Sequence, residues 1–281
     1  MSSLVSGEWL EANAADPKLC IIDLRWYLDD PSRGRRAYGE GHIPHARFVD
    51  LDQITGPLVA GGAGGRHPLP GPAQLTEVMR AVGVNQSSHV VVYDDAGGSV
   101  AGRLWWLLRA HGHEGVSVLD GGLPAWPGVL ATEVPTVTPG DFLAHAPDSA
   151  GIVDAAAVAS LGTATVLLDA RAPERYRGEV EPVDPAAGHI PGAVHAFWKD
   201  NLDGAGRFLA PADLERRFRE LGVEPGGAVV YCGSGVTACH DLLAIERAGL
   251  GPVRLYAGSW SDWCSRPSAP VAVGPAPGGR S

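Results

Sequence analysis

Cysteine is scarce in this sequence, and its spacing excludes the common metal sites. It occurs four times in 281 residues, at Cys20, Cys232, Cys239 and Cys264. These positions form no Cys-x-x-Cys pair, and no histidine completes a zinc pattern, so we expect neither a metal nor another cofactor. So few cysteines in so long a chain favour a reducing compartment, and we expect the protein to be cytoplasmic.

Long apolar runs and an excess of positive charge are also missing. No stretch approaches the length that spans a membrane, and residues 1–17 lack the basic start and apolar run of a signal peptide. The net charge of −10 argues against nucleic acid or an anionic membrane as a partner. An anionic substrate would therefore have to be attracted by local positive charge.

The composition is that of an ordinary globular protein, with 45% hydrophobic and 19% charged residues. The length allows one large domain or two ordinary ones.

Four segments recur in the same order at a nearly constant offset. The pairs are 20–25 with 166–171, 41–46 with 188–193, 90–93 with 228–231, and 116–122 with 253–259. A tryptophan follows each member of the last pair, at Trp126 and Trp263. The sequence is therefore a tandem duplication, with a period much longer than that of a solenoid repeat.

Each half alternates short apolar strands with helical patterns. The helical patterns cover 75–82, 104–110, 155–161, 214–221 and 238–250. Such alternation predicts two α/β domains, each a parallel sheet flanked by helices. We place the boundary in the turn-rich segment 138–151, which gives domains 1–140 and 141–281.

Two Gly- and Pro-rich segments carry no periodic pattern. The run 61–66, which ends on Arg66, lacks a following Lys-Ser/Thr and a helix, so it predicts a loop and not a phosphate cradle. The tail 267–281 is expected to fray or to wrap over the surface.

The most informative stretch is 228–240. A buried strand, Ala228 to Tyr231, ends on Cys232, two glycines follow at Gly233 and Gly235, and a helical pattern then begins. A cysteine at such a turn faces the free N–H groups and the dipole of the helix, which favour an anion. The pattern predicts a nucleophilic thiolate within a loop of inward-pointing amides. The alternative is a buried structural thiol.

The other cysteines and the first half offer no second nucleophile. Cys239 lies seven residues after Cys232, about two helical turns away, which favours a buried role over that of a resolving thiol. Aligned halves place Asp94 opposite Cys232 and Asp95 opposite Gly233. We therefore expect one catalytic centre, in domain 141–281, and a structural role for domain 1–140.

These motifs resemble the tandem-domain rhodanese sulfurtransferases over nearly the whole length of the chain. The resemblance rests on Gly-His-Ile-Pro-x-Ala at 41–46 and 188–193, on the closers Gly-Gly…Trp and Gly-Ser-Trp, and on the loop 232–237. The loop looks like that of the mercaptopyruvate branch. The resemblance implies that Cys232 takes a sulfur from an anionic donor as a persulfide and passes it to cyanide or a thiol, including the thiol of a thioredoxin-like protein.

The resemblance also implies which residues bind the donor. They are Arg175, Gly233, Ser234, Gly235, Val236 and Thr237. Arg175 matches the family's arginine for the acidic group of the donor, and Arg177 is a weaker candidate.

The sequence departs from the mercaptopyruvate branch in two places. A second arginine usual in that branch is replaced by Val183, before Asp184. The family's Asp and His helpers correspond to Asp52 and His67, with a loop of different length between them.

Other polar residues of the repeats are expected to be structural. His42 and His189 suit turn stabilisation, and Asp169 and Arg171 suit an ion pair beside the strand end.

The neutral residues Gly233 and Ser234 favour 3-mercaptopyruvate over thiosulfate as donor, because the thiosulfate branch has basic residues there. Thiosulfate remains the alternative. A cysteine phosphatase would need an arginine near Thr237 and Ala238 to clamp phosphate, and none is there. A non-catalytic sulfur carrier or interaction module would suit the first half alone.

Overall fold

The structure, a computed structural model, describes residues 2–279. The chain divides into two compact units. Unit 1 contains the residues up to Gly56, residues 70–147 and residues 204–208. Unit 2 contains residues 57–69, residues 148–203 and the chain from Leu209 onward. Two segments, 57–69 and 204–208, therefore belong to the unit that is built mainly from the other half of the sequence.

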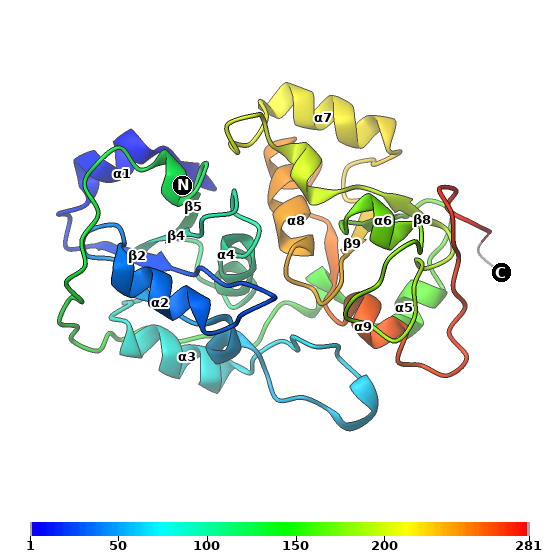
Figure 1. Cartoon of the computed structure of the whole chain (residues 1–281), viewed down its shortest axis with the longest axis horizontal. Coiled ribbons are helices and arrows are strands. Elements are labelled where there is room, and N and C mark those ends of the chain that lie inside the picture. The colour runs from blue at the N-terminus through cyan, green and yellow to red at the C-terminus, as the bar shows by residue number, and fades with distance from the viewer. Residues whose placement is uncertain (1, 280–281) are drawn as a thin grey trace. The chain divides into compact units, whose positions relative to one another are not determined.

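Each unit is built on a five-stranded parallel sheet (Figure 1). The strands of unit 1, in spatial order, are β1 (Leu4–Val5), β5 (Val116–Leu119), β4 (His89–Tyr93), β2 (Leu19–Asp23) and β3 (Arg47–Phe48). Its helices are α1 (Gly7–Asn13), α2 (Arg33–Glu40), α3 (Pro72–Ala81) and α4 (Ala101–Ala110).

Unit 2 repeats this order. Its strands are β6 (Ile152–Val153), β10 (Arg254–Tyr256), β9 (Ala228–Tyr231), β7 (Val166–Asp169) and β8 (Ala193–His195). Its helices are α5 (Ala155–Ala159), α6 (Pro173–Tyr176), α7 (Pro211–Glu220), α8 (Ala238–Arg247) and α9 (Ser259–Trp263). The predicted pair of parallel sheets flanked by helices is confirmed, and the repeated strand order is what a duplication requires.

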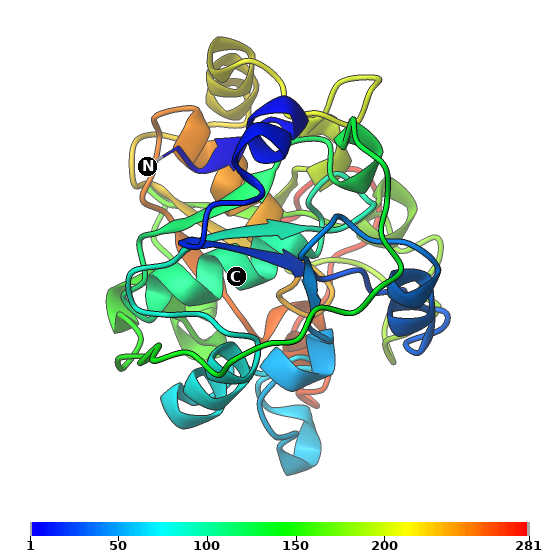
Figure 2. The ribbon, with the colours of Figure 1, turned by 90° about the vertical axis from the view of Figure 1, so that its left-hand side faces the viewer.

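Helices cover the sheets because the central strands are apolar on both faces. In unit 1, Leu10 of α1 packs with Val91 and Tyr93 on one face of the sheet. The helix α4 lies beside β4 and β5 and runs next to the strands in Figure 2, where it is drawn in blue-green. In unit 2, Val229 and Tyr231 pack with Trp260 of α9, while α8 contacts β9 and β10.

The repeated histidines stabilise turns, as expected. Each ring is buried, stacks on a tyrosine at a centroid distance of 3.9 Å and bonds the carbonyl oxygen of that tyrosine through Nδ1 at 2.8 Å. The pairs are His42 with Tyr38 and His189 with Tyr176. The ion pair expected between Asp169 and Arg171 is also present, at 2.6 Å.

Several short elements do not follow from sequence periodicity. The edge strands β1, β3, β6 and β8 have two or three residues each, too few for a pattern to register. The last predicted helix ends at Arg247 and not at Leu250, because Gly249 takes a left-handed conformation with φ of 73°. The tail wraps along unit 2, where Ala272 bridges His189 and the Pro277 carbonyl accepts from Gly192.

Candidate active site

Cys232 stands at the carboxyl end of β9, the central strand of the unit 2 sheet. Its amide donates to Ser259 Oγ at 3.1 Å, and its carbonyl accepts from the Trp260 amide at 2.9 Å. Residues 233–237 then curl before α8 begins. At Gly235 φ is 80°, and a Cβ there would lie 2.3 Å from the Ala257 carbonyl oxygen, so this turn requires glycine.

The loop encloses the Cys232 thiol. Its Sγ accepts a hydrogen bond from the Gly235 amide at 3.1 Å, and Cys232 is only 2% exposed. The amino terminus of the ten-residue helix α8 adds partial positive charge beside the loop. The amide and the helix end thus place partial positive charge beside the Cys232 sulfur.

The structure brings the five predicted loop residues together around this sulfur. Ser234 and Val236 are buried, and Thr237 is the residue before α8, without a side-chain capping bond. Arg175, at the end of α6, reaches the same loop, since its Nη1 lies 3.2 Å from the point where a Cβ of Gly233 would stand. A side chain at position 233 would therefore push against the guanidinium.

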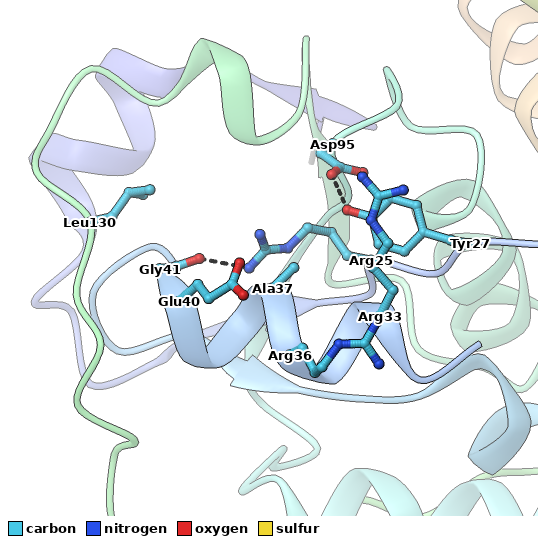
Figure 3. A pocket seen from close by; sticks show the side chains of 9 residues that line it. All are labelled: Arg25, Tyr27, Arg33, Arg36, Ala37, Glu40, Gly41, Asp95 and Leu130. Atoms are coloured by element: carbon cyan, nitrogen blue, oxygen red, sulfur yellow. Dashed lines mark hydrogen bonds between the residues drawn. The ribbon is translucent and has the colours of Figure 1, made fainter. Parts of the chain in front are cut away.

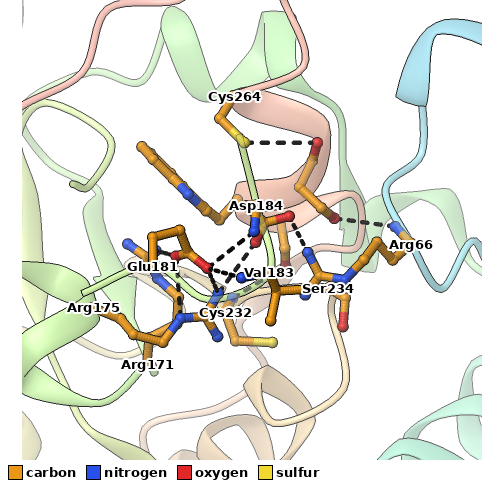
Figure 4. A network of polar contacts seen from close by, with 12 residues as sticks. Arg66, Arg171, Arg175, Glu181, Val183, Asp184, Cys232, Ser234 and Cys264 are labelled. Atoms are coloured by element: carbon orange, nitrogen blue, oxygen red, sulfur yellow. Dashed lines mark hydrogen bonds and ion pairs between the residues drawn. The ribbon is translucent and has the colours of Figure 1, made fainter. Parts of the chain in front are cut away.

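Two buried carboxylates hold Arg175 in place. Its Nε and Nη2 donate to Glu181 at 3.1 and 2.7 Å, and Nη2 also donates to Asp184 at 3.2 Å. The side chain of Arg175 is 17% exposed, whereas both acids are 3% exposed. The guanidinium is thus fixed from behind and keeps a face toward the loop (Figure 4).

A second guanidinium, which sequence reasoning missed, belongs to Arg66. It forms an ion pair with Asp184, on a different side of that residue from Arg175 (Figure 4). Its Nη2 lies 3.2 Å from the Cβ point of Gly233, the same distance as Arg175 Nη1. Val183, in the place of the family's usual second arginine, is 37% exposed. The only sequence signal for Arg66 is its position next to His67.

The loop 57–69 reaches unit 2 through its backbone. The Arg66 amide donates to Ser261 Oγ at 3.1 Å, and the Gly64 amide donates to Asp262 at 3.3 Å. At Gly65 φ is 75°, and a Cβ there would lie 2.3 Å from the Gly258 carbonyl oxygen. The glycine run begins in a short 3-10 helix, Ala60–Gly62, and its remaining residues form the predicted loop. Its glycines allow this close approach.

His67 contacts the loop directly. Its Nδ1 lies 2.7 Å from Ser234 Oγ, and both residues are 7% exposed. The other predicted helper, Asp52, lies in the 3-10 helix Leu51–Ile54 of unit 1. Arg177 is engaged elsewhere, because it pairs with Glu179 on the surface at 2.7 Å.

The remaining cysteines lie in different environments. Cys239 is closer to the loop than expected, and its Sγ donates to the Gly235 carbonyl at 3.4 Å. The distance of two helical turns was wrong because residues 233–237 form a loop, so Cys239 belongs to the first turn of α8. Burial raises the pKa of Cys20, and burial together with Asp184 raises the pKa of Cys264 to about 11.

Unit 1 fills the equivalent loop with a carboxylate of its own. Asp94, which follows β4 and is 1% exposed, accepts four backbone amides at 2.8–2.9 Å, from Ala96, Gly98, Val100 and Ala101. In the equivalent loop of unit 2, the Gly235 amide donates to the Cys232 sulfur. The loop of unit 1 is therefore filled by a carboxylate where unit 2 has its thiol.

Among residues 2–279, no group of three or more His, Cys, Asp or Glu side chains is arranged to hold a metal ion. Within the same residues, no helix combines the length and the apolar character needed to cross a membrane.

Comparison with known proteins places the chain in a family. The rhodanese-like domain matches twice, over residues 6–128 and 154–266. A Pseudomonas aeruginosa protein named "Probable 3-mercaptopyruvate sulfurtransferase" is 49% identical over 281 residues, covering 97% of this chain and 99% of that protein. SseB of Mycobacterium tuberculosis, which carries the name of a thiosulfate sulfurtransferase, is 42% identical over 275 residues, or 94% of this chain and 93% of SseB.

A solved structure of the same family superposes on the chain. The crystal structure of SseA from Escherichia coli, described as a 3-mercaptopyruvate sulfurtransferase with the rhodanese fold, superposes with a TM-score of 0.80 at 34% identity. The match covers 92% of this chain and 99% of SseA. With both domain matches, these relatives and the cysteine cradle at the end of β9, the chain belongs to the rhodanese family.

Proposed function

We propose that this rhodanese-family sulfurtransferase uses 3-mercaptopyruvate as its main donor and carries the sulfur as a persulfide on Cys232. The observation that carries the proposal is the meeting of three groups at the loop. Two guanidiniums, of Arg66 and Arg175, flank Gly233, and the next residue, Ser234, carries a hydroxyl. The single carboxylate of 3-mercaptopyruvate matches the guanidiniums, and its keto oxygen matches the hydroxyl.

The first half-reaction moves one sulfur to the enzyme. The Cys232 thiolate attacks the sulfur of 3-mercaptopyruvate, an S–S bond forms, and the C–S bond breaks. The electron pair of that bond stays on the carbon as the enolate of pyruvate, which takes a proton. The keto oxygen therefore gains negative charge in the transition state. A hydrogen-bond donor placed beside that oxygen accelerates the reaction.

Ser234, positioned by His67, suits the role of that hydrogen-bond donor. If Nδ1 of His67 donates to Ser234 Oγ, the hydroxyl hydrogen is left for the keto oxygen of the donor. The carboxylate is bound by Arg66 and Arg175, whose planar guanidiniums match it. The Gly235 amide and the amino terminus of α8 then stabilise the persulfide anion.

The second half-reaction frees the thiolate. Cyanide or a thiolate attacks the outer sulfur of the persulfide, the S–S bond breaks, and its electron pair returns to Cys232. The product is thiocyanate when cyanide is the acceptor, or a persulfide when the acceptor is a thiol, such as that of a thioredoxin-like protein. We place this chemistry in domain 141–281 of a cytoplasmic protein. All four cysteines are free, which suits a reducing compartment. The loop 57–69 contributes to the site, and domain 1–140 holds no second nucleophile of this kind.

Thiosulfate is the second candidate donor. Two guanidiniums also suit a dianion, and SseB carries the name of a thiosulfate sulfurtransferase. Here the S–S bond of the donor breaks and sulfite leaves, so Ser234 would have no keto oxygen to bind.

Steady-state kinetics with both donors and cyanide tests the proposal. We expect a higher kcat/KM with 3-mercaptopyruvate in the unaltered protein. Ser234→Lys should shift the ratio toward thiosulfate, because it removes the hydroxyl and adds a cation. A higher kcat/KM with thiosulfate in the unaltered protein would assign thiosulfate as the donor.

A further inference from the structure

We propose that unit 1 holds a second ligand site, for a small monocarboxylate, in a cavity of about 450 Å³ beside α2. The cavity is lined by Arg25, Tyr27, Arg33, Arg36, Ala37, Glu40, Gly41, Asp95 and Leu130 (Figure 3). It lies wholly within unit 1 and shares no residue with the Cys232 site.

Arg25 of unit 1 is the counterpart of Arg171 in unit 2. Each arginine stands two residues after a strand and pairs with the aspartate that ends the strand. The Nη2–Oδ2 distance is 2.7 Å from Arg25 to Asp23 and 2.6 Å from Arg171 to Asp169. In each, Nη2 also donates to the carbonyl of the glycine in Gly-His-Ile-Pro, again at 2.7 and 2.6 Å. Both side chains are therefore held in the same way.

The two arginines differ at Nη1. In unit 2, Arg171 Nη1 donates to Glu181 at 3.4 Å. In unit 1, Arg25 Nη1 has no hydrogen-bond partner within residues 2–279, although Arg25 is only 5% exposed. Its guanidinium lines the cavity, near the labelled Gly41 and Ala37 (Figure 3). The Nη1 N–H groups of Arg25 therefore remain available to an acceptor in the cavity, and a carboxylate is the strongest acceptor for a guanidinium.

The cavity exists because unit 1 lacks the side chains that occupy the corresponding place in unit 2. Tyr38 and Tyr176 correspond, so Ala37 stands where unit 2 has Arg175. Twelve residues separate Tyr176 from His189, but only three separate Tyr38 from His42, so Glu181 and Asp184 have no counterpart. An incoming carboxylate would take the place of the Glu181 carboxylate.

Charge at the rim is mixed, with one free cation among the described lining residues. The Arg33 guanidinium stacks over the Tyr27 ring at 4.1 Å and has no ion pair within residues 2–279, whereas Arg36 pairs with Asp30. Two acids also line the cavity: Asp95 accepts from the Tyr27 hydroxyl, and Glu40 ends α2. The Arg33 guanidinium lies beside Tyr27 and Asp95, so we assign the carboxylate to the other end of the cavity, at Arg25 (Figure 3). The volume suits a molecule of the size of pyruvate with ordered water.

The test uses the full chain with Arg175→Ala, which removes a cation from the Cys232 loop so that binding there does not obscure the second site. Equilibrium dialysis with labelled pyruvate should show one saturable equivalent per chain. Adding Ala37→Arg, which restores the side chain found in unit 2, should weaken this binding at least tenfold. Gly39→Arg is the matched control, because it adds the same charge to α2 at a point with nothing within 4 Å of its Cβ position.

Pyruvamide, which lacks the carboxylate, should bind at least tenfold more weakly than pyruvate. The proposal is overturned if the Arg175→Ala chain shows no saturable pyruvate binding, if Ala37→Arg and Gly39→Arg bind alike, or if pyruvamide binds as well as pyruvate. To check folding, Ala37→Arg is also made alone, without Arg175→Ala. This single variant should keep its cyanolysis activity.

Discussion

Gly233 is the residue at which the charges of the candidate site meet. It has no side chain, and the guanidiniums of Arg66 and Arg175 lie at equal distances from its missing Cβ. Asp184 joins the two arginines, and Glu181 holds Arg175 from the other side. The acids orient the arginines without covering the loop, so a donor anion can be bound by both.

Substitution of either arginine should weaken use of the anionic donor. A charge-assisted hydrogen bond contributes roughly 1.5–3 kcal/mol, so Arg175→Ala should lower kcat/KM for 3-mercaptopyruvate by about 10- to 150-fold. Arg66→Ala should lower it by about tenfold or more for the same reason. Arg177→Ala is the control, because its guanidinium pairs with Glu179 on the surface. Unchanged donor kinetics in both Arg66→Ala and Arg175→Ala would contradict the assignment.

The helix α8 carries the amino-terminal dipole behind Cys232 and also buries an acid. Asp241 is inaccessible to solvent, and its Oδ1 accepts from Asn201 Nδ2 at 2.6 Å. Burial raises the pKa of Asp241 to about 7, against the opposing effect of Arg217. The folded protein therefore holds this proton more tightly than the unfolded chain does.

Stability should consequently depend on pH through Asp241. Because the pKa is raised on folding, this contribution is fully present below about pH 4 and is lost as the pH rises through about 7. Asp241→Asn removes the titration. The free energy of unfolding of this variant, measured relative to that of the unaltered protein, should therefore rise by about 1–4 kcal/mol between pH 4 and pH 8. Urea titrations across this range measure the difference. Asp213→Asn, on the exposed side of α7, is the control and should show no such trend. A pH-independent difference for Asp241→Asn would refute the assignment.

At the level of elements, the sequence predicts the central strands and the longer helices well. The runs at 90–93 and 228–231 are apolar, β-branched and repeated, and both are central strands in the structure. The short edge strands escape prediction because two or three residues cannot show a period. The loop 57–69 escapes for another reason: its attachment to unit 2 depends on backbone bonds such as Arg66 to Ser261, which no local pattern encodes.

For the whole molecule, the duplication explains both what could be predicted and what could not. The repeat predicted two like sheets, and comparison of Asp94 with Cys232 predicted one nucleophile, because only one half ends its central strand on a thiol. The roles of Arg175 and of the loop 233–237 remain predictions, which the geometry supports by bringing them together. Arg66 could not be assigned because the sequence places it in the first half, far from the residues that it contacts.

The central claim is that Cys232 alone carries the transferable sulfur. The direct measurement is the intact mass of the protein after incubation with 3-mercaptopyruvate and no acceptor, followed by removal of the donor. The unaltered protein and Cys239→Ser should each gain the mass of one sulfur atom, which cyanide then removes, whereas Cys232→Ser should gain none. A cyanide-labile sulfur on Cys232→Ser, or its absence from the unaltered protein, would contradict the account.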